Sequence, residues 1–324
     1  MKGPLLMLAL VVMLALVVAA CSPGETAEST TTSTTSTSIA TPTTLPPTTS
    51  SSAPSTTTTT EATTTTGATS TTTTSLLEGN WAEGPLVTTD FGALGWWDGS
   101  DWLDSETEGA LPIVGGEDYQ TIVLDSLGLT TAGPQTIVCE PLELLGVQLA
   151  DPGLLGDFPG PYGVAISAPW GLQPYLFEET TDDGSYTVFA SEILSNRGLE
   201  VATPVVKQLI RTDLEGDGVN EVLVVAEDVT PGFLMEVGDY SIVFMRKVIE
   251  GEVQTAILEE TVVLGEDQQY SGAHSVGTVA DLNGDGKMEI VTNSAFFEGF
   301  GVSVWEYVND DLGPVVRLQN GCGS

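Results

Sequence analysis

Two acidic segments in the C-terminal half of the chain have the residue types and spacing of calcium loops. They cover residues 213–221 and 281–289, so that equivalent positions lie 68 residues apart. Oxygen-bearing side chains occupy positions 1, 3, 5 and 9 of each segment, and a glycine able to turn sharply occupies position 6. Calcium takes six to eight oxygen ligands in flexible geometry, and position 7 can add a backbone carbonyl. We therefore expect two Ca²⁺ sites, with ligands from Asp213, Glu215, Asp217, Val219 and Glu221 and from Asp281, Asn283, Asp285, Lys287 and Glu289.

The two loops differ in charge. The first loop brings four carboxylates, whereas the second brings three carboxylates, Asn283 and the basic residue Lys287. Because more carboxylate ligands attract calcium more strongly, we expect the first site to be the tighter one.

The spacing separates these loops from helix-flanked calcium loops, which place their last acidic ligand at position 12. Position 12 is Val224 in the first copy and Thr292 in the second, and both loops run directly into strand-like sequence. The pattern resembles the FG-GAP/VCBS-type repeat of integrin-like β-propellers, in which a D-x-[DN]-x-D-G-x-x-E loop joins two strands of a blade. The resemblance covers about residues 204–230 and 272–307, and the first copy departs from it at position 3, where Glu215 stands. It implies blade-like sheets and bound calcium.

Short runs of β-branched and aromatic residues separated by turn residues predict an all-β fold. Asp98-Gly99 and Asp183-Gly184 are hairpin-type turns, and residues 140–149 are the best candidate for a helix after the N-terminal apolar segment. The predicted strands include residues 136–139, 162–167, 186–190, 221–225, 240–245 and 302–307.

A 68-residue repeat has the length of one four-stranded propeller blade. Residues 77–324 provide enough chain for between three and four such blades. We expect a small β-propeller-like domain after a disordered linker. The alternative is a pair of blades packed on a separate N-terminal β-domain.

The N-terminus has the pattern of an export signal. Lys2 precedes residues 5–20, which contain no polar side chain, and a helix of that length spans about 24 Å, less than the roughly 30 Å membrane core. A signal peptide over residues 1–20 is therefore expected rather than a membrane span. The following Cys21 resembles the lipidated cysteine of bacterial lipoproteins, where small residues precede an invariant cysteine. The resemblance implies an extracytoplasmic protein, held at the bacterial cell membrane or envelope by lipid on Cys21.

Residues 22–76 are almost entirely Thr, Ser, Pro and Ala. Such a segment buries too little apolar surface to offset its ordering entropy, so we expect disorder. Together with Cys21 it forms a predicted linker over residues 21–76. A flexible coil of this length averages about 40 Å end to end, enough to hold a domain away from a membrane.

The net negative charge of the chain restricts which molecules it can bind. Cleavage before Cys21 removes Lys2 and leaves 7 basic against 45 acidic residues, a formal charge of −38. This field repels nucleic acid and anionic lipid head groups and favours cations. We therefore expect no nucleic-acid partner, and the membrane is expected as a partner only through the lipid.

Two cysteines remain for the domain if Cys21 carries lipid. An even pair in an oxidising compartment predicts a disulfide between Cys139 and Cys322. Two free buried thiols are the alternative.

Sequence features of catalysis are weak. The segment Ala273-His274-Ser275-Val276-Gly277 matches A-x-S-x-G, but His274 is the only histidine and adjoins the serine, so a hydrolase triad lacks its distant base. A structural role for His274 and a non-catalytic protein are expected. The alternative is a polysaccharide-active enzyme that uses a carboxylate pair.

Three tryptophans lie around the Asp98-Gly99 turn: Trp96, Trp97 and Trp102. Exposed aromatic rings beside carboxylates can stack on sugars, whereas buried rings would fill the core. We therefore expect a calcium-binding surface lipoprotein whose domain is structural or binds an extracellular glycan or protein. The sequence leaves its oligomeric state open.

Overall fold

The computed structural model describes residues 77–105, 111–139, 142–156, 160–180, 184–231, 234–265, 272–296, 299–307 and 314–323. The predicted signal peptide, the predicted lipidation site at Cys21 and the predicted linker lie outside these residues. Strands dominate the described part, which confirms the all-β prediction. None of its helices combines the length and apolar character that a membrane span requires.

The N-terminal part forms a seven-stranded antiparallel sheet in the order β3-β2-β1-β7-β4-β5-β6. Because β7 lies between β1 and β4, strands distant in sequence hold the two halves of this sheet together. A short 3₁₀-helix, η1 (Pro152–Leu155), follows β6. The strands are β1 (Leu86–Thr88), β2 (Ala93–Trp97), β3 (Trp102–Asp104), β4 (Asp118–Val123), β5 (Ser126–Val138), β6 (Leu144–Leu149) and β7 (Val164–Ser167).

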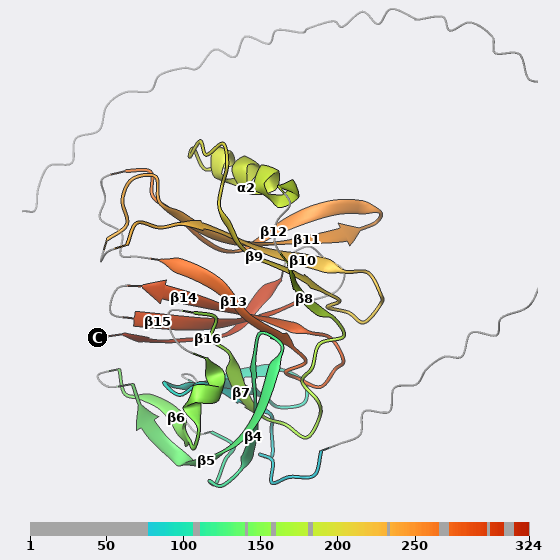
Figure 1. The fold of residues 1–324 in the computed structure, drawn as a ribbon. Helices are drawn as coiled ribbons and strands as arrows, with labels where there is room; N and C mark the ends of the chain where they lie inside the picture. The colour runs from blue at the N-terminus through green and yellow to red at the C-terminus, as the bar shows by residue number, and fades with distance from the viewer. Residues whose placement is uncertain are drawn as a thin grey trace, which may run out of the picture. The chain divides into compact units, whose positions relative to one another are not determined.

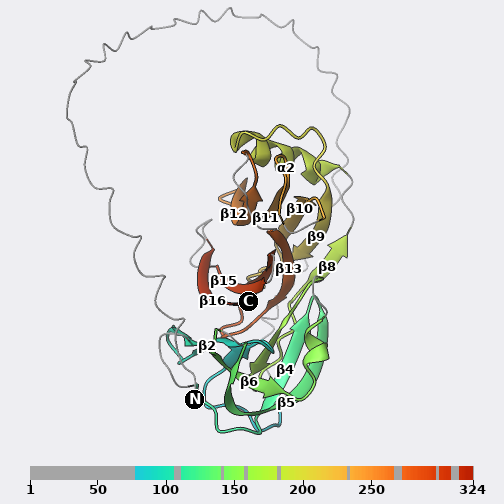
Figure 2. The same cartoon turned by 90° about the vertical axis from the view of Figure 1, so that its left-hand side faces the viewer.

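The long strand β5 curls this sheet. Its first half pairs with β4 and its second half with β6, and the register shifts between Ala132 and Gln135. The intervening Gly133-Pro134 interrupts regular pairing, and such irregularities bend and twist a strand. Figure 2 shows the resulting curvature of β4, β5 and β6.

The middle of the chain forms a five-stranded sheet in the order β12-β11-β10-β9-β8. The helix α2 (Ser185–Asn196) lies against one face, where Ala190 and Leu194 join an apolar cluster with Val224 and Phe244 of the sheet (Figure 1). The strands are β8 (Phe177–Thr180), β9 (Val206–Thr212), β10 (Glu221–Asp228), β11 (Tyr240–Ile249) and β12 (Glu252–Val262).

Two local predictions were wrong. Residues 186–190 belong to α2 and not to a strand, because Ala190, Ile193 and Leu194 lie at helical spacing and bury one face against the sheet. Their tertiary contacts outweigh the β propensity of the preceding residues. Conversely, the candidate helix over residues 140–149 contains the strand β6 instead.

The C-terminal part forms a four-stranded sheet whose two faces are both covered (Figures 1 and 2). Its strands, in this order, are β13 (Ala273–Ala280), β14 (Glu289–Phe296), β15 (Gly299–Glu306) and β16 (Val315–Gly323). Val291 and Val302 pack with Ile166 of the seven-stranded sheet. Ile290 packs on the opposite side with Leu223 of the five-stranded sheet.

The backbone of β13 approaches the seven-stranded sheet closely at Gly277. A Cβ atom there would lie 2.1 Å from the carbonyl oxygen of Tyr162. Asn293 fixes the same junction, because its side chain accepts from the Tyr162 N–H at 2.9 Å and donates to the Tyr162 carbonyl at 2.8 Å. The glycine of the A-x-S-x-G match therefore serves close packing, and Ser275 lies within a strand and not at a strand-to-helix turn.

The arrangement shares with the alternative two successive antiparallel sheets and a differently built N-terminal sheet, but all the described residues belong to one compact unit and not to separate domains. Strands β9–β12 and β13–β16 form two successive blade-like antiparallel units, with β8 added to the first. The N-terminal part forms one seven-stranded sheet in place of the further four-stranded blades expected from the chain length. The 68-residue repeat matched the spacing of the two C-terminal units. The length of the remaining chain did not indicate how its strands would be grouped into sheets.

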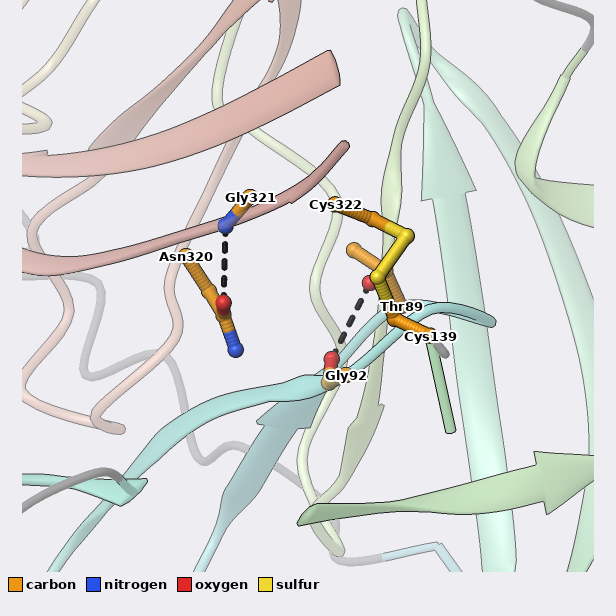
Figure 3. The surroundings of a disulfide bond; sticks show 6 residues. All are labelled: Thr89, Gly92, Cys139, Asn320, Gly321 and Cys322. Atoms are coloured by element: carbon orange, nitrogen blue, oxygen red, sulfur yellow. Dashed lines mark hydrogen bonds between the residues drawn. A yellow bond between two sulfur atoms is a disulfide. The ribbon is translucent and has the colours of Figure 1, made fainter. Parts of the chain in front are cut away.

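Cys139 and Cys322 form a disulfide, with their Cα atoms 5.8 Å apart and 183 residues between them in sequence. Cys139 follows β5, and Cys322 lies in β16 (Figure 3). The bond therefore links the curled N-terminal sheet to the last strand of the chain. It stands close to the turn in which the Thr89 hydroxyl donates to the Gly92 carbonyl at 3.0 Å.

Candidate metal loops and an adjoining hollow

The two acidic loops occupy equivalent places in the two blade-like units. The first connects β9 to β10 and the second connects β13 to β14. They also touch, because the Met288 N–H donates to the Leu214 carbonyl at 2.8 Å. The repeat-equivalent residues Gln208 and Val276 meet as well: the Gln208 amide accepts from the Val276 N–H at 2.9 Å and donates to its carbonyl at 3.1 Å. Residues at equivalent positions of the sequence repeat therefore lie at equivalent, neighbouring positions in the structure.

Both loops fold around the aspartate at position 1. Asp213 accepts backbone N–H groups from Asp217 and Gly218 at 3.1 and 2.9 Å. Asp281 accepts them from Gly284 and Gly286 at 2.7 and 3.1 Å. Gly218 and Gly286 at position 6 adopt left-handed φ angles of 82° and 83°, a conformation that glycine allows without a Cβ clash.

The glutamate at position 9 closes each loop. Glu221 accepts the Leu214 N–H at 2.9 Å, and Glu289 accepts the Leu282 N–H at 2.6 Å. Both glutamates are 1% exposed. The backbone N–H groups of the position-7 residues, Val219 and Lys287, turn toward the position-5 aspartates, each at 2.7 Å. The predicted ligand residues are thus gathered locally in each loop.

These donors suit calcium in their chemistry, but their present arrangement is not that of a coordination shell. Among the described residues, no group of three or more His, Cys, Asp or Glu side chains is disposed to hold a metal ion. Several carboxylate oxygens are directed instead to backbone N–H groups of their own loop. Calcium ligation would require the acidic side chains to redirect these oxygens.

A lysine enters the first loop from the neighbouring strand β11. The Lys247 ammonium lies 2.5 Å from Glu215 Oε2 and 3.3 Å from Glu221 Oε1, and 4.0 Å from the centre of the Tyr307 ring. Burial alone would lower the pKa of Lys247, but its hydrogen bond to Glu215 and the charge of Glu221 outweigh burial and raise it. The lysine therefore carries its positive charge against two of the predicted ligands.

A carboxylate takes the corresponding place beside the second loop. Val222 pairs with Arg246, so that Glu221 faces Lys247, whereas Ile290 pairs with Trp305, so that Glu289 faces Glu306. Glu306 accepts from the Asn283 amide at 3.5 Å and from Arg317 Nε at 2.5 Å.

Among the residues that the structure describes, no Lys, Arg or His forms an ion pair with Asp281, Asp285 or Glu289 of the second loop. Burial raises the pKa of Asp281 to about 6, and the charge of Asp285 adds to this. Burial, followed by the charges of Asp281, Asp285 and Glu306, raises the pKa of Glu289 well above its usual value. A cation placed here would relieve both the desolvation and the repulsion.

Two aromatic residues that the sequence did not single out support the loops. Trp170 Nε1 donates to the Asp281 carbonyl at 2.9 Å, and its ring covers Gly284. Tyr175 donates its hydroxyl to the Gly286 carbonyl at 3.1 Å while its ring lies against Gly216 of the first loop. Tyr175 therefore joins the two loops.

The three predicted sugar-stacking tryptophans separate into two environments. Trp96 is 9% exposed and packs into the core of the seven-stranded sheet. Trp97 and Trp102 face each other across the β2–β3 hairpin with ring centres 5.3 Å apart. The Asp98-Gly99 turn that joins these strands is confirmed, and Gly99 has a φ of 99°. Asp183 of the other predicted turn lies outside the described residues.

Trp97 and Trp102 border a hollow of about 360 Å³ beside the second loop. Its other walls are mostly polar and come from Asp285, Lys287, Glu306 and Arg317. The carboxylate of Asp98 takes no part, because it accepts the backbone N–H groups of Ser100 and Asp101, each at 2.8 Å, which lowers its pKa. The hollow thus combines three aromatic residues, Trp97, Trp102 and Tyr307, with charged groups of both signs.

His274 has the structural role expected for it. Its Nε2 lies 2.9 Å from the Thr261 hydroxyl, and its Nδ1 lies 2.9 Å from the Ser294 hydroxyl. Burial lowers the pKa of His274 to about 4. Both ring nitrogens are engaged in a buried site, so the imidazole holds strands together.

No family model matches the chain, and comparisons with curated proteins and with solved structures give no match. What the chain itself shows is two acidic loops of one pattern, each joining consecutive strands of its sheet. Function is inferred from the same residues.

The buried imidazole predicts a defined acid sensitivity. Because the pKa of His274 is lower in the folded than in the unfolded chain, its stabilising effect is present above pH 6.5 and is lost as the pH falls toward 4. Between pH 6.5 and 4.5 this group should cost about 2–3 kcal/mol of unfolding free energy. Denaturant unfolding of the wild type and of His274→Gln at both pH values measures it. Parallel losses in the two proteins would contradict the assignment.

Proposed function

We propose that this chain is a non-catalytic, calcium-binding lipoprotein of the bacterial cell surface, which presents its β-rich domain at a distance from the membrane. One observation carries the calcium proposal: two acidic loops of the same pattern adopt the same backbone fold at equivalent places in two blade-like units. The side-chain oxygens that each loop gathers at positions 1, 3, 5 and 9 are the hard donors that calcium prefers. Bound to these oxygens, calcium would cross-link the loop and neutralise its charge.

The location is proposed from the N-terminal sequence. The apolar segment before Cys21 and the Thr/Ser-rich residues after it fit an exported, lipid-anchored and tethered domain. The disulfide between Cys139 and Cys322 supports an oxidising compartment. The anchor holds the chain where calcium is abundant.

Calcium should stabilise the full chain. A single site filled at 100 times its dissociation constant adds about 2.7 kcal/mol, which for a domain of this size raises Tm by roughly 5–10 °C. Scanning calorimetry with calcium and with excess chelator should show at least this difference in the wild type and a smaller one in Asp281→Asn, which removes a predicted ligand of the second loop. Asp125→Asn, at an exposed acid in the β4–β5 turn, is the matched control and should respond as the wild type does. A wild-type Tm indifferent to chelator would refute the proposal.

The lipid anchor makes a separate prediction. Cells that express the wild-type chain with a labelled fatty acid should incorporate the label into it, whereas Cys21→Ser should remain unlabelled. Cys139→Ser serves as the control and should keep the label, because that cysteine belongs to the domain. An unlabelled wild-type chain would exclude lipidation.

Glycan binding is the second candidate function, and the hollow beside Trp97 and Trp102 favours it. Sugars pack their apolar faces on aromatic rings while their hydroxyls bond to charged side chains, and this hollow offers both. Trp96 is excluded from this role by its burial.

The glycan candidate is tested on a panel of cell-wall and extracellular polysaccharides. A ligand should shift the tryptophan fluorescence of the wild type, and Trp97→Ala should abolish its binding in calorimetry. Phe296→Ala removes a 40%-exposed aromatic side chain that does not line the hollow, and it should leave binding intact. Equal loss in both variants would argue against a site in the hollow.

A further inference from the structure

We propose that Lys247 takes the place of the metal in the first loop, so that the chain binds one calcium ion, in the second loop. This inference rests on the proposed calcium function and refines it. The two loops share a sequence pattern, but the strand beside each supplies a residue of opposite charge.

The contacts of Lys247 place its ammonium among the donor atoms of the first loop. Nζ lies 2.5 Å from Glu215 Oε2 and 3.3 Å from Glu221 Oε1. These carboxylates stand at positions 3 and 9, two of the five positions expected to bind calcium. The ammonium donates charge-assisted hydrogen bonds to these two carboxylates and so satisfies oxygens that a bound metal would otherwise coordinate.

Calcium and this ammonium cannot share the two carboxylates comfortably. A calcium ion bound to Glu215 Oε2 would lie about 2.3–2.6 Å from that atom, and Lys247 Nζ lies 2.5 Å from the same atom. The two cations would then be at most about 5 Å apart, with no water layer between them. Their repulsion opposes entry of the metal.

The surroundings of Lys247 also fix its ammonium beside the first loop. Lys247 is 4% exposed and lies on β11, a strand paired on both sides within its sheet. The Tyr307 ring stands 4.0 Å from Nζ and favours a cation at that point. To enter the first loop, calcium would therefore have to displace an ammonium that is buried and already paired with two carboxylates.

The second loop differs at the equivalent place. Glu306 faces Glu289 there, in the register that puts Lys247 opposite Glu221. Among the described residues, the ion pairs of this region join Glu306 to Arg317 and none joins a cation to Asp281, Asp285 or Glu289. Lys287, the basic residue of the loop itself, is exposed. The second loop therefore offers its carboxylates to an external cation.

This assignment reverses the ranking expected from the loop sequences. Counting ligands within each loop favoured the first, with four carboxylates. That count omitted Lys247, which lies 26 residues beyond Glu221 and reaches the loop only through strand pairing. A charge supplied by the neighbouring strand decides which loop requires a metal.

Equilibrium dialysis of the full chain against radioactive calcium tests the proposal. One ion per chain is expected for the wild type. Asp213→Asn and Asp281→Asn are a matched pair at position 1 of the two loops. Asp213→Asn should retain the ion and Asp281→Asn should lose it. Two ions per wild-type chain, or loss of the ion in Asp213→Asn, would overturn this inference while leaving calcium binding in place. A wild type that binds no calcium would defeat the proposed function as well.

A second variant tests the cause. Lys247→Met keeps much of the length of the side chain but removes the ammonium, so the first loop should gain a calcium site and the stoichiometry should rise to two. The variant should also become more dependent on calcium for its thermal stability than the wild type. A stoichiometry that stays at one would show that the lysine is not what excludes the metal. If the variant does not fold, the Asp213 and Asp281 pair decides the proposal alone.

Discussion

The four-stranded sheet β13–β16 must bury both of its faces, and the rest of the domain is arranged around that requirement. Successive residues on β14 point to opposite sides, so Ile290 contacts the five-stranded sheet and Val291 the seven-stranded one. Burial of apolar surface on two sides is the largest favourable contribution such a layer can make. It also demands close backbone approach, which Gly277 permits and Asn293 secures through its two bonds to Tyr162. The disulfide at Cys322 then holds the last strand of this layer to the curled sheet.

This layering places the two acidic loops in contact. It also buries acidic side chains of both loops, which is electrostatically unfavourable. Each loop lies at the end of a hairpin whose strands are buried, so its position-9 glutamate is drawn out of water with them. A buried carboxylate is costly unless a positive charge or several donors compensate it. The first loop obtains a cation from within the chain, at Lys247. Within the described part of the chain, the acids of the second loop accept from backbone donors and form no ion pair, and Asp281 and Glu289 have raised pKa values.

The sequence predicted features that depend on local pattern. The loops, the β class, the Asp98-Gly99 turn, the role of His274 and the pairing of Cys139 with Cys322 followed from spacing, propensity and counting. Features that depend on partners distant in sequence were missed. The helix α2 exists because Ala190 and Leu194 meet a sheet, and Trp96 and Trp97 differ because alternate residues of a strand face opposite sides. The seven-stranded sheet depends on the position of β7 between β1 and β4. The sequence repeat does not predict this strand order.

Lys247 was missed for the same reason, although a local signal was present. It is one of only eight basic residues in the chain and stands in a strand that is otherwise mostly apolar, Tyr240–Ile249. A lone ammonium in such a strand is costly to bury unless a carboxylate meets it, and the nearest carboxylates of the same sheet are those of the first loop. Predicting the contact between Lys247 and these carboxylates from sequence requires knowledge of the register of β10 against β11. A shift of one residue would turn the lysine to the other face of the sheet. The charge balance of an acidic loop is therefore a property of the whole sheet, because a neighbouring strand can supply the base that pairs with its carboxylates.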